Sequence, residues 1–361
     1  MELYFLDAQF EPIPDAGAAD TFSSVVWSER YFENGTFTLH FIKDFLPSVR
    51  NAVYVRTGIE AETGRMRCGR ITYILTDDEE NGGECEMGGY LLESLFDDRV
   101  LAGKGCYTGT LKEAVRSAVA DNLRGCGVVL GVDDVLPDTQ VSLTYEWDTL
   151  SDWLYSVLRP FGASYRIELS PEENVPVFRI VCGTDRSSGV GSTVSDSYNP
   201  GQAVFSASFG NIASIRFEQD LSGMKNVVYA EGADGTIVTV DQSGTSSKRE
   251  MYKQVSDVKP ADFSGTAAYT AALRQRGEEI LAKHAGNVYV AAGTEPDTLP
   301  KYGVDYALGD ICDVADDTLG LAFGLRLTAV DDVWENGTRM LYPSFGEEVR
   351  QIRNFVPDKR G

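Results

Sequence analysis

Two stretches of the sequence share the four residues ENGT and lie near opposite ends of the chain. The first is WSERYFENGTFTLHF, residues 27–41, and the second is VDDVWENGTRMLYPSF, residues 330–345. Asn-Gly favours a two-residue hairpin turn, because a type I′ turn requires positive φ at both central positions. Two such hairpin turns are therefore expected, at Asn34-Gly35 and at Asn336-Gly337.

The residues after the first turn alternate between apolar and polar, as in a β-strand with one buried face. The apolar members of this alternation are Phe37, Leu39 and Phe41. A two-residue loop predicts that Phe32 pairs with Phe37 and that Glu29 lies opposite His40. His40 is then interpreted as a residue on the surface of a strand.

Length and charge limit the classes of protein to which this chain could belong. A chain of 361 residues is long enough for two or three domains. Its 32 Lys and Arg against 55 Asp and Glu give a net charge of −23. So acidic a chain is a poor candidate for gripping nucleic acid phosphates. Acidic surfaces would instead let a polyanion slide past.

The sequence contains no pattern that indicates a catalytic, metal or cofactor site. It has two histidines, and none of its six cysteines forms a C-x-x-C pair, which argues against a zinc site. The glycines of GKGCYTG, residues 103–109, miss the spacing of a phosphate-binding loop. The acidic turn that begins at Asp77 has Gly88 where an EF-hand requires its bidentate carboxylate. We therefore expect no enzyme activity, no cofactor and no metal.

Cysteine usage and hydropathy bear on where the protein is assembled. Six cysteines spread over 361 residues are interpreted as free thiols of a protein assembled in a reducing cytoplasm. The N-terminal residues lack the basic and apolar regions of a signal peptide. No run of 18 apolar residues occurs in the chain, so no membrane span is expected.

The order of predicted elements gives a β-rich α+β fold. Helices are predicted over residues 110–125, with a capping box of Thr110 and Glu113, over residues 149–162 and over residues 265–286. We expect two small β-barrel domains that flank an α/β domain, with the third helix inserted in the C-terminal β region. The predicted division is a β-barrel domain at 1–90, an α/β domain at 91–184, a linker at 185–202, a second β-barrel domain at 203–346 and a short tail at 347–361. Pro343 inside the last strand predicts an edge position for that strand.

Four segments resemble the tail-tip baseplate hub family of long-tailed bacteriophages, which includes the N-terminal module of tail-associated lysin proteins. They cover both β regions in the order that the family has: VVWSERYFENGTFTLHF, FGNIASIRFEQDLSGMKNVVYAEG, YALGDICDV and LRLTAVDDVWENGTRMLYPSFGE. The α/β segment fits the family by position only. Only VRQIRNFVPDKRG follows the last predicted barrel, whereas many relatives continue into a spike, a peptidoglycan-cleaving domain or a fibre. This departure puts a lytic role in doubt.

The resemblance implies a structural role in the virion tail tip. It implies a homotrimeric ring that closes the tail tube, docks on the hexameric distal tail protein and holds the C-terminus of the tape-measure protein. Receptor-binding or spike proteins would be further partners. Genome DNA would pass through the opened ring without specific binding.

A different reading of the same residues is a β-rich protein that binds cell-surface carbohydrate. Aromatic residues near the hairpins would then serve as stacking platforms: Trp27, Tyr31 and Trp334. Packing in a core or an interface is the commoner fate of such side chains. Oligomeric state separates the two hypotheses, because a hub is expected to form a trimer.

Overall fold

A computed structural model gives the arrangement of most of the chain. It describes residues 1–14, 16–19, 22–76, 83–131, 136, 138–188, 201–256, 258–262, 265–284, 286–294, 298–316, 320–335 and 337–346. The chain divides into two compact units. Unit 1 comprises Met1–Arg216 and Ala291–Phe345, and unit 2 comprises Phe217–Val290 and Gly346–Gly361. The boundaries predicted at residues 90, 184 and 202 stay a prediction.

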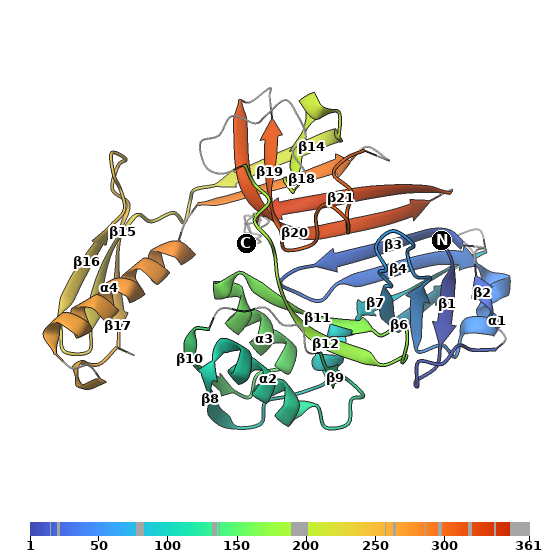
Figure 1. Cartoon of the computed structure of the whole chain (residues 1–361), viewed down its shortest axis with the longest axis horizontal. Coiled ribbons are helices and arrows are strands. Elements are labelled where there is room, and N and C mark those ends of the chain that lie inside the picture. The colour runs from blue at the N-terminus through green and yellow to red at the C-terminus, as the bar shows by residue number, and fades with distance from the viewer. Residues whose placement is uncertain are drawn as a thin grey trace, which may run out of the picture. The chain divides into compact units, whose positions relative to one another are not determined.

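A 13-stranded sheet is the main feature of unit 1 (Figure 1). Its main path runs in the order β14-β18-β21-β20-β3-β4-β7-β6-β5-β1-β2, and β19 joins β13 to β20. The N-terminal strands are β1 (Leu3–Leu6), β2 (Ala18–Ala19), β3 (Phe22–Arg30), β4 (Thr36–Ile42), β5 (Tyr54–Thr57), β6 (Cys68–Thr76) and β7 (Glu84–Leu91). The others are β13 (Val204–Ser206), β14 (Ile212–Asp220), β18 (Asn287–Thr294), β19 (Ile311–Asp316), β20 (Leu321–Glu335) and β21 (Thr338–Gly346). The predicted β-rich character is confirmed.

The expected β-barrels are not present in the part of the chain that the structure describes. The strands of the predicted first and last domains pair directly with each other, because β20 pairs antiparallel with β3 from Ala329↔Arg30 to Glu335↔Ser24. The two ends of the chain therefore build one open sheet rather than two closed barrels. The predicted edge position of Pro343 is also wrong, because β21 lies between β18 and β20.

The α/β segment matches the predicted helices closely. It contains β8 (Lys104–Thr110), α2 (Leu111–Asn122), β9 (Val129–Leu130), β10 (Gln140–Glu146), α3 (Leu150–Leu158), β11 (Ala163–Leu169) and β12 (Pro176–Cys182). Thr110 and Glu113 form the predicted capping box at the start of α2. After α3, Gly162 adopts a left-handed conformation and ends the helical turn. Both helices contribute to one core with β11 and β12.

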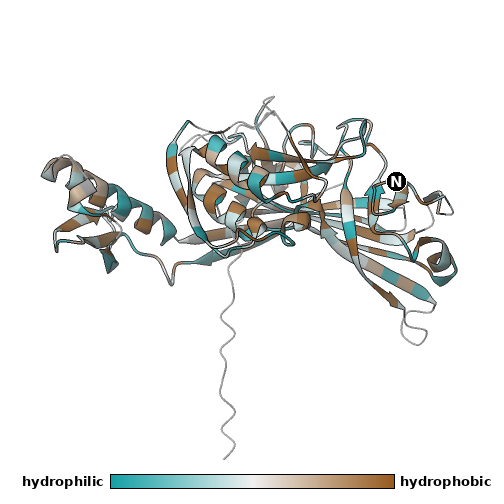
Figure 2. Cartoon of the chain, turned by 90° about the horizontal axis from the view of Figure 1, so that it is seen from below, coloured by the Kyte–Doolittle hydropathy of each residue, from teal (hydrophilic) through white to brown (hydrophobic). Residues whose placement is uncertain are grey.

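Short helical turns connect several of these strands. They are η1 (Lys43–Phe45), α1 (Leu46–Val49), η2 (Leu92–Phe96), η3 (Arg159–Phe161), η4 (Ala207–Phe209) and η5 (Pro260–Asp262). Along the strands of the large sheet, hydrophilic and hydrophobic residues alternate (Figure 2). In β4, for example, Phe37, Leu39 and Phe41 are buried, as predicted.

Unit 2 is a small three-stranded sheet covered by one helix. Its sheet has the order β16-β15-β17, formed by β15 (Val227–Gly232), β16 (Ile237–Asp241) and β17 (Glu250–Val255). The helix is α4 (Thr266–Lys283), which confirms the inserted helix predicted over 265–286. The chain leaves unit 1 within β14 and returns to it within β18.

The first ENGT segment does not form the predicted two-residue turn. Residues 31–35 connect β3 to β4, and the ladder pairs Trp27, rather than Phe32, with Phe37. His40 pairs with Ser24 on one side and Glu86 on the other, so the predicted contact of His40 with Glu29 is wrong. The connection is longer than Asn-Gly predicts because both residues are held by tertiary contacts.

Asn34 and Gly35 serve packing between elements. Asn34 donates from Nδ2 to Asp97 at 2.7 Å, and its Oδ1 accepts from the Tyr155 hydroxyl at 3.2 Å. A Cβ at Gly35 would lie 2.5 Å from Leu91 Cδ1 and 2.6 Å from the Ser28 carbonyl oxygen. Gly35 is therefore required by close approach rather than by positive φ.

The second ENGT segment agrees better with the predicted two-residue hairpin turn. Glu335 pairs with Thr338, so two residues connect β20 to β21. Gly337 has φ of 78° and no neighbour that a Cβ would meet within 4 Å. Asn336 lies outside the described residues, as does the acidic turn over 77–82. The two ENGT copies therefore occupy different local structures.

A cluster of buried and half-buried charges, which we call the Arg67 cluster, joins segments from the N-terminal and C-terminal parts of the chain. Its members are Glu29, Glu60, Arg65, Arg67, Asp332 and Arg339. The guanidinium group of Arg67 pairs with Glu29 at 2.8 Å, with Glu60 at 2.8 Å and with Asp332 at 2.9 Å. Asp332 is fully buried and also accepts from Arg339 at 2.7 and 2.9 Å.

The electrostatics of the cluster favour its charged form. Burial alone would raise the pKa of Glu29, but the guanidinium groups of Arg65 and Arg67 outweigh this effect and hold that pKa well below its ordinary value. Burial would also raise the pKa of Glu60, but the nearby guanidinium of Arg67 opposes this effect. The pKa of the Glu60 carboxyl is therefore lowered. Each carboxylate is thus an integral partner of a buried arginine.

Replacement of Gly35 by alanine is expected to destabilise unit 1 by about 1–3 kcal/mol, because the added methyl group meets the Ser28 backbone and buried Leu91. Gly58→Ala is the matched control, since its Cβ would meet only Tyr4 at 4.0 Å. Urea unfolding followed by tryptophan fluorescence measures both, because all four tryptophans lie in unit 1. Equal midpoints for the two variants would contradict the packing role of Gly35.

Glu29→Gln is expected to cost about 1–3 kcal/mol, because buried Arg67 and half-buried Arg65 lose their shared carboxylate, while Arg67 keeps Glu60 and Asp332. Asp331→Asn is the control, since it breaks a partly exposed pair with Arg30 and should cost about 0–1 kcal/mol. The same urea titration measures both. A loss for Glu29→Gln as small as that of the control would show that the cluster contributes little.

The Arg67 cluster also predicts acid sensitivity. Because the pKa of Glu29 is lower in the folded than in the unfolded chain, its contribution to stability is complete above about pH 4.5 and is lost as the pH falls toward the folded pKa. The free energy of unfolding should therefore fall between pH 4.5 and pH 2.5. The fall should be shallower in Glu29→Gln, which lacks the titrating group. Parallel pH profiles for the two proteins would contradict this assignment.

Candidate functional site

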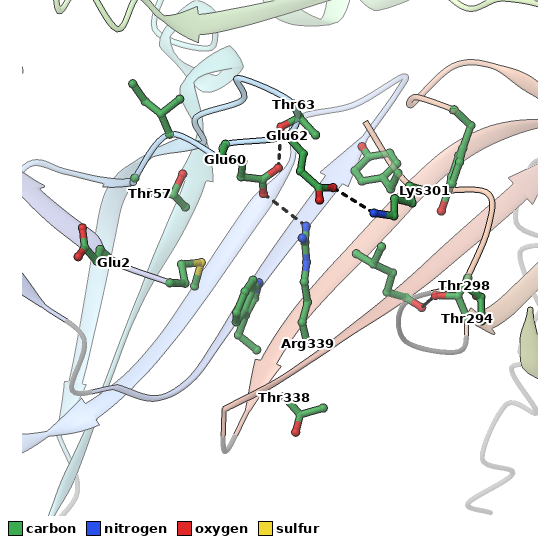
Figure 3. A pocket seen from close by; sticks show the side chains of 18 of the residues that line it. Glu2, Thr57, Glu60, Glu62, Thr63, Thr294, Thr298, Lys301, Thr338 and Arg339 are labelled. Carbon is green, nitrogen blue, oxygen red and sulfur yellow. Dashed lines mark hydrogen bonds and ion pairs between the residues drawn. The ribbon is translucent and has the colours of Figure 1, made fainter. Parts of the chain in front are cut away.

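A cavity of about 770 Å³ lies in unit 1 beside the Arg67 cluster (Figure 3). Four segments line it: the N-terminal residues Met1 and Glu2, residues 57–63, a part of residues 294–306, and the β20–β21 hairpin. The cavity therefore opens where segments from the two ends of the chain meet. Its shape depends on the same contacts that join those ends.

Opposite charges face each other across this cavity. Residues 57–63 contribute Glu60 and Glu62, whereas the C-terminal segments contribute Lys301 and Arg339. Lys301 Nζ lies 3.4 Å from Glu62, and Arg339 Nη2 lies 3.4 Å from Glu60. The Glu62–Lys301 pair is exposed, so solvent screens it and it contributes little stability. A ligand with charged groups could exchange partners with it at small cost.

Aromatic side chains form part of the cavity wall, and arginine side chains of the protein stack on them. The guanidinium of Arg339 lies 5.2 Å from the Trp334 ring, and that of Arg65 lies 4.7 Å from the Tyr302 ring. The Tyr302 hydroxyl donates to Glu29 at 3.1 Å. Burial raises the pKa of Tyr302 to about 12, so its hydroxyl keeps the proton that it donates. The wall suits polar contacts rather than base or nucleophile chemistry.

The histidines and the acidic residues do not form a recognisable reaction centre among the described residues. There, no group of three or more His, Cys, Asp or Glu residues could hold a metal ion. His284 Nδ1 lies 2.9 Å from the Ile280 carbonyl oxygen at the end of α4. The GKGCYTG segment is largely β8, which leads directly into α2.

The predicted turn residues contribute unequally to this site. Gly337 lines the cavity, whereas Asn34 and Gly35 lie outside its lining. Trp27 and Tyr31 are fully buried and cannot stack on a carbohydrate. Trp334 lines the cavity, but the Arg339 guanidinium lies over its ring.

The central members of the Arg67 cluster, Arg67 and Asp332, are not among the residues predicted from the sequence. A signal was present, because Val330, Asp332 and Trp334 alternate on one face of a strand and place a carboxylate at an inward position. A buried carboxylate requires a cationic partner. The alternating arginines of RMR, residues 65–67, were the available partners.

Comparisons with known proteins agree on the class of protein. No helix in the described part of the chain is long and apolar enough to cross a membrane. No curated protein matches the sequence. A family model described as Siphovirus ReqiPepy6 Gp37-like protein matches residues 16–347.

Three solved structures of similar fold are tail proteins. The 43 kDa tail protein of prophage MuSo2 from Shewanella oneidensis is 11% identical, with a TM-score of 0.59 over 96% of this chain and 97% of that chain. The tail protein from Neisseria meningitidis MC58 is 13% identical, with a TM-score of 0.57 over 96% of each chain. Prophage tail protein gp18 from Listeria monocytogenes EGD-e is 12% identical, with a TM-score of 0.54 over 98% of this chain and 96% of that chain. The match over most of the chain shows that this protein belongs to the Siphovirus ReqiPepy6 Gp37-like family of phage tail proteins.

Proposed function

We propose that this protein is the structural hub of the tail tip, a homotrimeric ring that closes the tail tube. The observation that carries the proposal is the continuous sheet built from both ends of the chain, in a fold shared with tail proteins over nearly their whole length. A rigid sheet held by buried charges suits a load-bearing part of a particle. No catalytic role is assigned to any residue.

A patch of exposed apolar side chains on this sheet, interspersed with Glu84 and Glu86 of β7, supports association with other chains. Ile42 on β4 and Leu75 on β6 are 56% and 55% exposed, and Tyr73 and Tyr90 are also exposed. Leu75 pairs with Glu86 of β7, which in turn pairs with His40 of β4, so these strands present one surface. Exposed apolar surface of this kind is commonly covered by a protein partner. We assign the neighbouring copy in the ring to this patch.

The remaining partners follow from the position of a hub in the tail. The ring would dock on the hexameric distal tail protein, hold the C-terminus of the tape-measure protein and carry receptor-binding or spike proteins. It would be assembled in the host cytoplasm and reside at the virion tail tip. The net charge of −23 supports passage of DNA without specific binding, because acidic walls repel phosphates.

The trimer is tested by light scattering coupled to gel filtration, which is expected to give three times the chain mass of 39.5 kDa. Leu75→Glu should shift the protein toward the monomer, because it places a charge inside the proposed interface. Val129→Glu, at another exposed apolar position of unit 1, is the matched control and should leave the mass unchanged. A monomer at all concentrations, alone and with the distal tail protein, would reject the ring.

A further inference from the structure

The sheet of unit 2 has one covered and one open face (Figure 1). On the covered face, Val228 and Ala230 of the central strand β15 pack in cores that include Leu273 and Leu281 of α4. Alternation along the strand directs Tyr229 and Glu231 to the opposite face. That face carries two large apolar side chains that are each 56% exposed, Ile237 and Tyr252.

The two tyrosines of the open face lie along the sheet instead of projecting from it. Tyr229 and Tyr252 are direct neighbours in the parallel pairing of β15 with β17. The Tyr229 hydroxyl donates to Glu250 at 3.0 Å, and the Tyr252 hydroxyl donates to Glu231. Each carboxylate lies diagonally across the pair from its tyrosine, so each ring must lean along the strands to reach it. The ring faces are thus available to a ligand.

The charges around these rings are mainly negative. Glu231 and Glu250 border the tyrosine pair, and Asp241 on β16 lies opposite Val227 and forms an ion pair with Lys248 at 2.8 Å. Aromatic ring faces next to carboxylates bind guanidinium groups especially well, because cation–π attraction and ion pairing act on one group. The chemistry of the face therefore selects a segment rich in arginine.

The chain itself contains such a segment. Residues 349–361, VRQIRNFVPDKRG, hold four basic residues, Arg350, Arg353, Lys359 and Arg360, against one acid, Asp358, in a chain whose net charge is −23. The segment follows Gly346, which belongs to unit 2 and lies against the Val288 carbonyl. Fifteen residues span up to about 50 Å when extended, which is ample for crossing three strands about 4.8 Å apart.

We propose that the Tyr229–Tyr252 face of unit 2 binds the chain's own basic segment, residues 349–361. Arg350 and Arg353 would stack on the two rings and pair with Glu231 and Glu250. Ile237 would contact an apolar side chain of the segment. This inference does not rest on the hub function.

The test uses two full-length chains and a labelled peptide. In the tail variant, Arg350, Arg353, Lys359 and Arg360 are all replaced by Gln, which frees the face. Fluorescence anisotropy then measures binding of a fluorescein-labelled peptide of residues 349–361. The tail variant should bind the peptide at least tenfold more tightly than the wild-type chain, in which the attached segment competes. Binding should weaken as salt is raised.

Substitutions in the tail variant locate the binding face. Adding Tyr252→Ser or Glu231→Gln should weaken peptide binding at least fivefold, and both are surface changes that the sheet should tolerate. Tyr342→Ser, at an exposed strand tyrosine of unit 1, is the matched control and should have no effect. Equal binding by the wild-type chain and the tail variant, or no response to Tyr252→Ser and Glu231→Gln, would overturn the proposal. The face would then be left to a partner protein.

Discussion

The fold depends on one guanidinium group that satisfies three carboxylates from distant parts of the chain. Arg67 is nearly inaccessible to solvent and pairs with Glu29, Glu60 and Asp332. Removing these charges from water is costly, and only the close geometry of all the pairs offsets that cost. The cluster therefore forms only when β3, residues 58–67 and β20 are all in place. Such an all-or-none contact specifies how the two ends of the chain meet.

The strand that carries Asp332, β20, connects the two ends of the chain. β20 is the longest strand and pairs with β3, β19 and β21, so it connects the N-terminal strands to the C-terminal ones. The α/β segment and unit 2 both lie between these ends in the sequence. The α/β segment is attached through Tyr31, whose hydroxyl donates to the Gly162 carbonyl at 3.0 Å and accepts from the Gly183 amide at 3.2 Å. An open sheet whose central strands come from both ends of the chain, β3 and β20, can carry such insertions without losing its register.

Local signals in the sequence were sufficient for helices and insufficient for the sheet. Thr110 and Glu113 cap α2 through contacts three residues apart, so the sequence alone contains the whole interaction. Asn34-Gly35 has the composition of a tight turn, but Leu91 and Asp97 determine its conformation from distant positions. The two barrels were predicted from strand composition, which says nothing of whether β20 pairs with β3. The inward position of Asp332 was readable, whereas its partner Arg67 could only be found in three dimensions.

The two candidate ligand sites, the cavity of unit 1 and the tyrosine face of unit 2, differ in the contacts that support them. The cavity beside the Arg67 cluster is framed by segments from both ends of the chain, and Glu60 and Arg339 belong to both the cavity lining and the cluster. The tyrosine face of unit 2 is built within one small sheet, whose opposite side has its own core with α4. Its side chains can therefore change without affecting the sheet of unit 1. A ligand surface on such an independent unit can be altered without disturbing the buried charges that join the two ends of the chain.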